Sequence, residues 1–368
     1  MGKLNDLEAL GQAVWLDFVD RKFLEEGGLK KLVEEDGLTG VTSNPSIFEK
    51  AMGHGAAYDD SLAAFDRAHP DAPTIERYEA LAIEDIKAAA DTLRPVYDRL
   101  GGRDGYVSLE VSPYLADDTD GTIAEAARLW KAVGKPDLMI KIPGTEAGVP
   151  AIAASIAAGI NVNVTLLFSN EAYKKVALAY VEGLEQRVAR GEPIDTIASV
   201  ASFFVSRIDG KIDKAIDALG TDEAKELRGK VAIANAKLAY QWYLDFIKSD
   251  RWQALAAKGA MPQRLLWAST STKDAAYPDT LYVDTLIGRD TINTIPPATM
   301  DAFRDHGTPQ ETLTADIDEA KHVLAEADRL GLDLDGVTET LVEEGVQSFA
   351  KAFDELLGSI AAKHPAAA

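Results

Sequence analysis

Short runs rich in β-branched residues alternate with longer helical patterns along most of this chain, and that alternation limits its fold more than any other feature. The strand candidates are Val14–Phe18, Thr39–Ser43, Tyr106–Val111, Asp137–Ile142, Asn161–Leu167, Ile197–Val205, Leu265–Thr270 and Thr291–Thr294. Helical patterns rich in Ala, Leu, Glu and Lys lie between them, such as Thr122–Val133, Asn170–Arg190 and Asp222–Ile247. Strands separated in this way pair in parallel through right-handed crossovers. About eight such units predict a closed (β/α)8 TIM barrel, with an open doubly wound sheet as the alternative.

Three helical stretches lie outside this simple alternation: Thr74–Leu100, Leu313–Leu330 and Thr338–Ala362. The last two predict a helical C-terminal extension, followed by a weakly structured KHPAAA tail. Glycine and proline mark loops but form no long linker. We therefore expect residues 1–368 to form a single domain, with a barrel core at about 13–300 and C-terminal helices at about 311–362.

The charge balance and the absence of cysteine exclude several classes of function. The chain carries 38 Lys and Arg against 60 Asp and Glu, a formal net charge of −22. This excess favours solubility, or adaptation to high salt, and argues against nucleic acid as a partner. Without cysteine there is no disulfide framework, thiolate metal site or cysteine nucleophile. MGKLNDLEAL has no apolar signal core and Val149–Ile160 is too short to span a bilayer, so we expect a cytoplasmic protein with no membrane partner.

Polar residues recur on one side of several predicted strands. Side chains alternate across a strand, so residues of the same parity share a face. In Asn161–Leu166 the odd positions are polar, and in Val107–Ser112 the polar set includes Glu110. Asp17 lies opposite the apolar face of its strand, and Lys141 stands between apolar neighbours in LMIKI. Because parallel strands in α/β proteins are covered on both faces, we expect Asp17, Glu110 and Lys141 to point into the barrel.

Three charged groups inside one barrel indicate a chemical site, with a structural ion-pair network as the alternative. Burial disfavours the ammonium form, so we expect Lys141 to act as a neutral amine. Such an amine attacks a ketone and forms a Schiff base, which is an electron sink for C–C bond cleavage. Asp17 and Glu110 could then move the protons that carbinolamine dehydration and aldol cleavage require.

Other chemistries find little support in the sequence. No GxGxxG follows a strand and no GxxxxGK[ST] occurs, so we expect no nucleotide-binding loop. The histidines form neither an HExxH motif nor a clear ligand pair, and none falls at a predicted strand end: His54, His69, His306, His322 and His364. We therefore expect neither a zinc site nor a Ser-His-Asp triad.

Several segments, in order, carry a resemblance to a known family: GVTSNPSIFEKA from Gly40, VSLEVSPYLA around Glu110, LMIKIPGT around Lys141, GINVNVTLLFS from Gly159 and SFFVSRID from Ser202. Together they resemble transaldolase from about Ala13 to Pro296, and WASTSTKD is similar to the longer-chain bacterial branch. The resemblance implies a Schiff-base aldolase on a (β/α)8 barrel, in the non-oxidative pentose phosphate pathway. Such an enzyme moves a dihydroxyacetone unit from sedoheptulose 7-phosphate to glyceraldehyde 3-phosphate, giving erythrose 4-phosphate and fructose 6-phosphate. It implies no metal or organic cofactor, because the imine replaces a Lewis acid.

The resemblance also implies roles for particular residues. Lys141, within IKIPGT, would form the Schiff base, and Asp17, within WLDF, would take the proton from the C4 hydroxyl during C–C cleavage. Glu110 and Thr165 would hold the water that relays protons during imine formation and release. The other residues implied around the dihydroxyacetone unit are Asn44 and Asn163, as hydrogen-bond partners of its hydroxyls, and Thr42 and Ser202, as lining residues.

At the phosphate end, Arg207 matches the phosphate-binding arginine of the family, and Ser269 a phosphate-contacting serine. Many members carry a second phosphate-binding arginine near Ser269, and the nearest cation in this sequence is Lys273. Lys273 would then bind the phosphate; the alternative is that it is a solvated lysine in a loop. Phe204 replaces the tyrosine that favours water-assisted release in relatives, so it favours transfer. The competing functions are a fructose 6-phosphate aldolase, a non-catalytic barrel that binds sugar phosphates, and a metal-dependent epimerase. The sequence leaves open a monomer or a homodimer.

Overall fold

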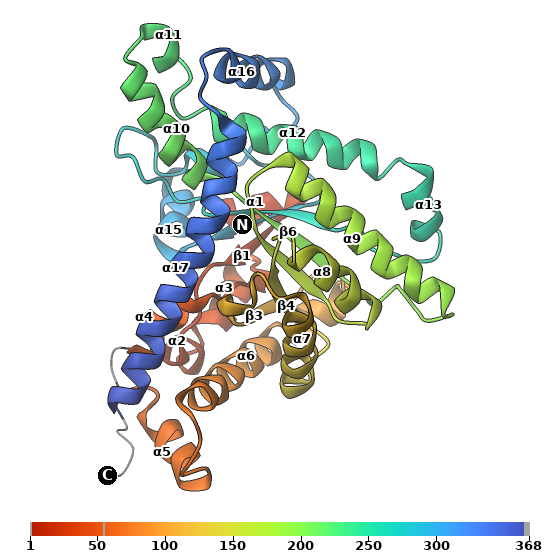
Figure 1. Cartoon of the computed structure of the whole chain (residues 1–368), viewed down its shortest axis with the longest axis vertical. Helices are drawn as coiled ribbons and strands as arrows, with labels where there is room; N and C mark the ends of the chain where they lie inside the picture. Colours follow the sequence, from red (N-terminus) through yellow and green to blue (C-terminus); the bar gives the residue numbers. More distant parts are fainter. Residues whose placement is uncertain (1, 54–55, 364–368) are drawn as a thin grey trace.

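The computed structural model describes residues 2–53 and 56–363, so His54, His364 and most of the predicted C-terminal tail lie outside it. Eight parallel strands form a barrel in chain order, which closes where β8 pairs with β1. Figure 1 shows the strands in the middle of the molecule with helices around them. The strands are β1 (Gln12–Leu16), β2 (Gly40–Val41), β3 (Tyr106–Glu110), β4 (Leu138–Pro143), β5 (Val162–Leu167), β6 (Ser199–Phe204), β7 (Arg264–Ala268) and β8 (Thr291–Ile295). The predicted (β/α)8 barrel is confirmed, and the open sheet is wrong. The assignment of the whole chain to one domain stays a prediction.

Helices connect the strands and cover the outside of the barrel. They are α1 (Lys3–Ala9), α2 (Arg21–Glu25), α3 (Gly28–Asp36), α4 (Pro45–Gly53), α5 (Asp59–Ala68), α6 (Thr74–Arg99), α7 (Thr119–Val133), α8 (Gly148–Ala157), α9 (Asn170–Ala189), α10 (Ser206–Leu219), α11 (Asp222–Lys225), α12 (Val231–Phe246), α13 (Asp250–Ala256), α14 (Leu281–Asp284), α15 (Pro297–His306), α16 (Ile317–Arg329) and α17 (Leu334–Lys363). A 3-10 helix, η1 (Pro113–Leu115), follows β3.

The polar residues of inward parity form a network inside the barrel. The whole of β4 and β5 is buried, because helices cover one face of each strand and the barrel interior covers the other. Asn163 Nδ2 donates a hydrogen bond to Ser108 Oγ at 3.0 Å, and Ser202 Oγ donates one to Asn163 Oδ1 at 2.7 Å. This network joins β3, β5 and β6, so the side chains of Ser108, Asn163 and Ser202 hydrogen-bond to one another.

Two of the predicted helical stretches differ from the structure for reasons of backbone geometry. The pattern over Asp222–Ile247 was expected to be one helical stretch, but it forms two helices, α11 and α12. Between them Gly229 adopts φ +68°, which glycine tolerates and other residues avoid. The predicted Leu313–Leu330 helix begins only at Ile317, because Asp316 before it lies in the left-handed region at φ +55°.

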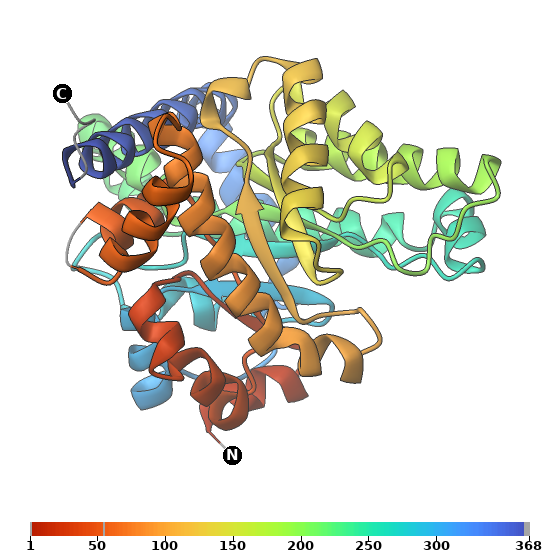
Figure 2. The same ribbon diagram turned by 90° about the horizontal axis from the view of Figure 1, so that it is seen from below.

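The C-terminal helix α17 crosses the carboxyl end of the barrel. It is 30 residues long, begins at Leu334 rather than at the predicted Thr338, and packs mainly against α4, with further contacts to α6 and α10. Figure 2 shows α17 at the end of the barrel opposite the N-terminus. The carboxyl ends of the strands carry the functional site of nearly every (β/α)8 enzyme, so α17 is placed to form part of such a site.

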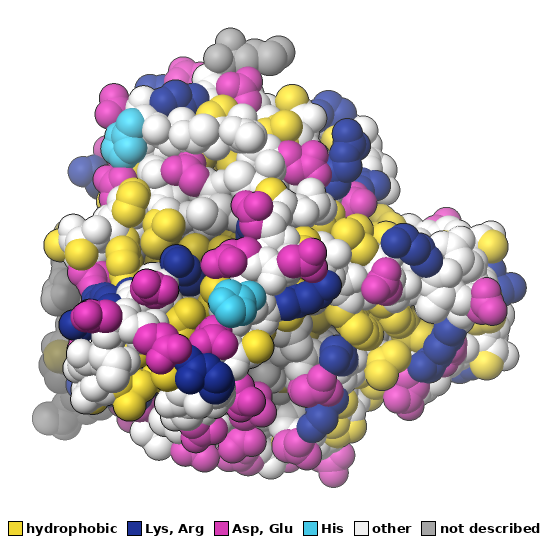
Figure 3. Space-filling view, turned by 90° about the horizontal axis from the view of Figure 1, so that it is seen from above, with side chains coloured by type: hydrophobic (Ala, Val, Ile, Leu, Met, Phe, Trp, Pro, Cys, Tyr) yellow, Lys and Arg dark blue, Asp and Glu magenta, His cyan; other side chains and the backbone are white. Residues whose placement is uncertain are grey.

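Charged side chains of both signs are scattered over the surface seen in Figure 3. The large excess of acidic residues is therefore not gathered into one block on this face. None of the helices that the structure describes is long and apolar enough to cross a membrane.

Candidate active site

A cavity of about 390 Å³ opens at the carboxyl end of the barrel. Strand ends, the loops that follow them and the helices α4, α10 and α17 contribute to its wall. The predicted site residues that line it are Asp17, Thr42, Asn44, Lys141, Ser202, Phe204, Arg207, Ser269 and Lys273. Residues from strands far apart in the sequence thus meet in one place, and strand parity predicts this for Asp17 and Lys141.

Lys141 and Glu110 form a buried pair on neighbouring strands. They lie opposite each other in the register of β3 and β4, and their side chains are only 5% and 8% exposed. Lys141 Nζ lies 3.5 Å from Glu110 Oε2 and donates a hydrogen bond to Ser43 O at 3.2 Å. Burial raises the pKa of Glu110 above its usual range, although Lys141 acts in the opposite direction. A carboxyl in this position can give and take a proton beside the amine.

Asp17 lies directly after β1 and points into the same cavity. Its Oδ1 accepts a hydrogen bond from Thr42 Oγ1 at 2.7 Å, and Thr42 Oγ1 lies 2.7 Å from Thr294 Oγ1. Burial raises the pKa of Asp17, while the bond from Thr42 and the charge of Lys141 oppose that rise. The result is a second carboxyl suited to accept a proton and return it.

The predicted residues of β5 lie deeper than the cavity. Asn163 is fully buried and its amide is engaged by Ser108 and Ser202, and it is not part of the cavity lining. Thr165 is also fully buried, and its Oγ1 has no hydrogen-bond partner among the residues that the structure describes. Glu110 Oε2 likewise has no hydrogen-bond partner among these residues, and its nearest charged neighbour is Lys141 Nζ at 3.5 Å. Buried polar atoms in this condition mark places where a small polar ligand or a water can bind.

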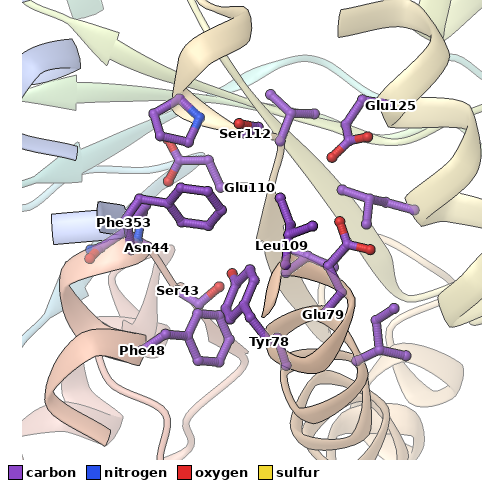
Figure 4. A pocket seen from close by; sticks show the side chains of 17 residues that line it. Ser43, Asn44, Phe48, Tyr78, Glu79, Leu109, Glu110, Ser112, Glu125 and Phe353 are labelled. Atoms are coloured by element: carbon purple, nitrogen blue, oxygen red, sulfur yellow. The ribbon is translucent and has the colours of Figure 1, made fainter. Parts of the chain in front are cut away.

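Glu110 also borders a second, smaller cavity of about 20 Å³. Figure 4 shows Glu110, Asn44 and Phe353 on one side of it and Glu79 and Glu125 on the other. A space of this size holds roughly one water molecule. Glu110 thus lines the smaller cavity and is linked to the main one through its pair with Lys141.

Cations gather in the main cavity although the chain is strongly acidic. Arg207, in the first turn of α10, and Lys273, in the loop after β7, both line it. Burial lowers the pKa of both groups, and Arg207 lowers that of Lys273 further. Lys50 of α4 lines the cavity as well and was missed in the sequence, although Ser46, Ile47 and Lys50 follow helical spacing in a segment already singled out. This part of the cavity suits an anionic group.

Two smaller residues have defined local geometry. Ser269 follows β7 in the left-handed region at φ +55°, and its Oγ lies 3.0 Å from Ser206 Oγ at the start of α10. Strained backbone of this kind is concentrated at functional sites. Asn44 caps α4, because its Oδ1 accepts from the Ile47 N–H at 2.9 Å, so its Nδ2 is the group left to serve a ligand.

One aromatic wall of the cavity was not foreseen from the sequence. Phe349 of α17 is 4% exposed, lines the cavity and lies with its ring centroid 5.9 Å from Lys141 Nζ. Phe204, at the end of β6, was predicted and supplies another aromatic wall, with the Arg207 guanidinium 5.2 Å from its ring centroid. Phe349 and Lys141 are more than two hundred positions apart in the sequence, so no local pattern could reveal that they lie close together.

Comparison with known proteins identifies the family. The model of the Transaldolase/Fructose-6-phosphate aldolase family matches residues 14–360. The chain belongs to this family. Its transaldolase-named relatives include "Transaldolase" of Trichodesmium erythraeum (strain IMS101), 50% identical over 98% of this chain and 97% of the relative. "Transaldolase" of Thiobacillus denitrificans is 49% identical over 98% of this chain and 100% of the relative. "Transaldolase 2" of Nostoc sp. (strain PCC 7120 / SAG 25.82 / UTEX 2576) is 50% identical over 98% of this chain and 97% of the relative.

Proposed function

We propose that this protein is a transaldolase that transfers a dihydroxyacetone unit from sedoheptulose 7-phosphate to glyceraldehyde 3-phosphate, in the pentose phosphate pathway. One observation carries the proposal: the buried amine of Lys141 lies 3.5 Å from Glu110 and shares a cavity with Asp17. Relatives named transaldolase, about half identical over nearly the whole chain, support it.

The first half of the reaction joins the donor to the enzyme. Lys141 Nζ first passes its proton to a neighbouring base, then attacks the C2 carbonyl of the ketose as a free amine, and the resulting carbinolamine loses its hydroxyl as water to give an iminium. Protonation of the leaving hydroxyl needs an acid next to the amine, and Glu110 is the nearest carboxyl. Thr165 Oγ1 and Glu110 Oε2 both have unused hydrogen-bonding capacity, which supports a water relay between these two residues.

The second half breaks and remakes a C–C bond. Asp17 takes the proton from the C4 hydroxyl, the C3–C4 bond breaks, and its electron pair moves into the iminium to give an enamine on Lys141. The aldose product leaves. The enamine carbon then attacks the aldehyde carbon of glyceraldehyde 3-phosphate, and Asp17 returns its proton to the new hydroxyl. Hydrolysis of the iminium releases fructose 6-phosphate and restores the amine.

The rest of the cavity would bind the sugar. Thr42, Asn44 and Ser202 line it close to the reacting end, and Asn163 would support Ser202 or reach the donor's hydroxyls after a local shift. The proposed phosphate ligands are Arg207, Lys273 and Ser269. Lys50 lines the same cavity and is proposed as a further ligand. Arginine, ammonium and hydroxyl groups are suitable phosphate partners.

A fructose 6-phosphate aldolase is the alternative within the family. Phe204 favours transfer over release, because its apolar ring offers no hydroxyl to activate a water at the cavity wall. The substrates are charged sugar phosphates that do not cross membranes unaided, so a cytoplasmic location is part of the proposal. Either a monomer or a homodimer is compatible with it.

The test is formation of erythrose 4-phosphate from sedoheptulose 7-phosphate and glyceraldehyde 3-phosphate. Lys141→Ala and Lys141→Arg should both fall below about a thousandth of the wild-type rate, because neither side chain can form the imine. Lys135→Arg, on a lysine paired with Asp91 outside the cavity, is the matched control and should retain activity. A substantial rate in either Lys141 variant would overturn the mechanism, and release of free dihydroxyacetone without transfer would favour the aldolase.

A further inference from the structure

We propose that Phe349 of α17 determines whether the enzyme-bound three-carbon unit is transferred to an aldehyde or lost to water. This inference rests on the proposed transaldolase function and assigns a specificity-determining role to a residue outside the barrel strands. It concerns the interval after the first aldose has left, when the enamine on Lys141 waits for its acceptor.

The distance between Phe349 and Lys141 leaves room for a group that is bonded to Nζ. Lys141 Nζ lies over the ring of Phe349, 5.9 Å from its centroid. Non-bonded atoms touch at about 3.5–4.0 Å, so Nζ itself does not touch the ring, and a separate layer between the two would need about 7 Å. A flat three-carbon unit joined to Nζ would therefore lie against the face of the ring. No water could then approach the unit from that side.

The ring also suits the charge of the intermediate that hydrolysis must pass through. Protonation of the enamine gives an iminium cation, which water attacks at C2 to release the unit. The face of an aromatic ring stabilises a cation without supplying a hydroxyl or a proton acceptor. Phe349 is 4% exposed, so the ring is held in the cavity wall and does not swing in solvent.

The packing of α17 fixes where this ring lies. One turn before Phe349 the helix passes so close to β5 that a Cβ on Gly345 would lie 2.8 Å from Leu166 Cδ2. Leu166 itself sits at φ +58°, where the register of β5 against β6 shifts. The side chain of Glu344 pairs with Lys211 of α10, and Asp354 accepts a hydrogen bond from Tyr114 of η1. These contacts on both sides of Phe349 hold the helix in one register over the barrel.

The experiment compares two rates in the full-length protein. Transfer is the formation of erythrose 4-phosphate from sedoheptulose 7-phosphate and glyceraldehyde 3-phosphate. Release is the formation of free dihydroxyacetone from fructose 6-phosphate with no acceptor present. Phe349→Ala should raise the ratio of release to transfer about tenfold, because it removes both the barrier to water and the cation–ring contact. Phe349→Leu restores bulk without an aromatic face and should give a smaller increase.

Leu356→Ala is the matched control for the stability of α17. Leu356 is fully buried on the same helix and lines neither of the cavities described above, so its truncation should leave the ratio of release to transfer unchanged. An unchanged ratio in a folded Phe349→Ala variant would overturn the inference, and so would an equal rise in Leu356→Ala. If Phe349→Ala does not fold by circular dichroism, the ratio in Phe349→Leu decides by the same criterion. Absence of both transfer and a borohydride-trapped adduct in the wild type would instead refute the proposed function.

Discussion

Replacing Lys141 by methionine should destabilise the protein mainly through the carboxylate that it leaves behind. Methionine keeps the length of the lysine stem and removes its charge. In the wild type Nζ lies 3.5 Å from Glu110 Oε2, and both side chains are less than a tenth exposed. At an effective dielectric constant of about 20 this attraction is worth about 5 kcal/mol. Removal of one partner from a buried pair costs about 3–5 kcal/mol, so we expect Lys141→Met to lose about that much stability at pH 8.

The assay is equilibrium unfolding in urea for the wild type, Lys141→Met, Glu110→Gln and the double variant. The double variant should recover most of the lost stability, because no unpaired charge stays buried. Burial already raises the pKa of Glu110, and loss of the lysine cation should raise it further. The folded state then binds the proton more tightly than the unfolded state, so the deficit of Lys141→Met should grow as the pH rises above about 4.5 and shrink in acid. A double variant as unstable as Lys141→Met would refute this reasoning.

Three further predictions concern other carboxyl groups. Asp17→Ala should still form the Schiff base with donor ketose but cleave it about 10²–10⁴-fold more slowly, as borohydride trapping and steady-state rates would show; normal cleavage would exclude Asp17 as the base. Thr42→Val removes the 2.7 Å hydrogen bond that lowers the pKa of Asp17, so the acidic limb of kcat/KM should move to higher pH, and an unmoved limb would contradict that assignment. Burial raises the pKa of Asp209 to about 7, so its carboxyl must lose a proton at a cost to the folded state as the pH rises. Relative to Asp209→Asn, the wild type should lose about 4 kcal/mol of stability between pH about 4 and 7, and the difference should stay constant above that. Parallel stability curves would contradict the last prediction.

The fold and the reacting groups could be predicted from the sequence because their signals are local. Alternation along each strand decides which side chains enter the barrel, and closure of the barrel then brings Asp17, Glu110 and Lys141 together whatever the loops do. The same reasoning placed Asn163 on the inward face but could not give its depth. The amide of Asn163 is hydrogen-bonded to Ser108 and Ser202 below the cavity floor. Its depth depends on how β3, β5 and β6 are staggered.

The contribution of α17 could not be predicted, because an amphipathic pattern shows that a helix packs without showing where. Phe349 reaches Lys141 only because α17 crosses the barrel at Gly345, a position set by contacts between distant segments. Gly229 shows a similar limit at short range. Its neighbours favour a helix, yet the backbone turns there and divides α11 from α12. Lys50, in contrast, was within reach of the helical spacing of its own segment.

The central claim is that the ε-amine of Lys141 condenses with a ketose. The most direct measurement is reduction with borohydride in the presence of fructose 6-phosphate, followed by mass analysis of the peptides. The account predicts a stable adduct of one dihydroxyacetone unit on the peptide that contains Lys141, and no adduct on Lys141→Arg. An adduct on another lysine, or turnover of the sugar with no trapped adduct at all, would contradict it.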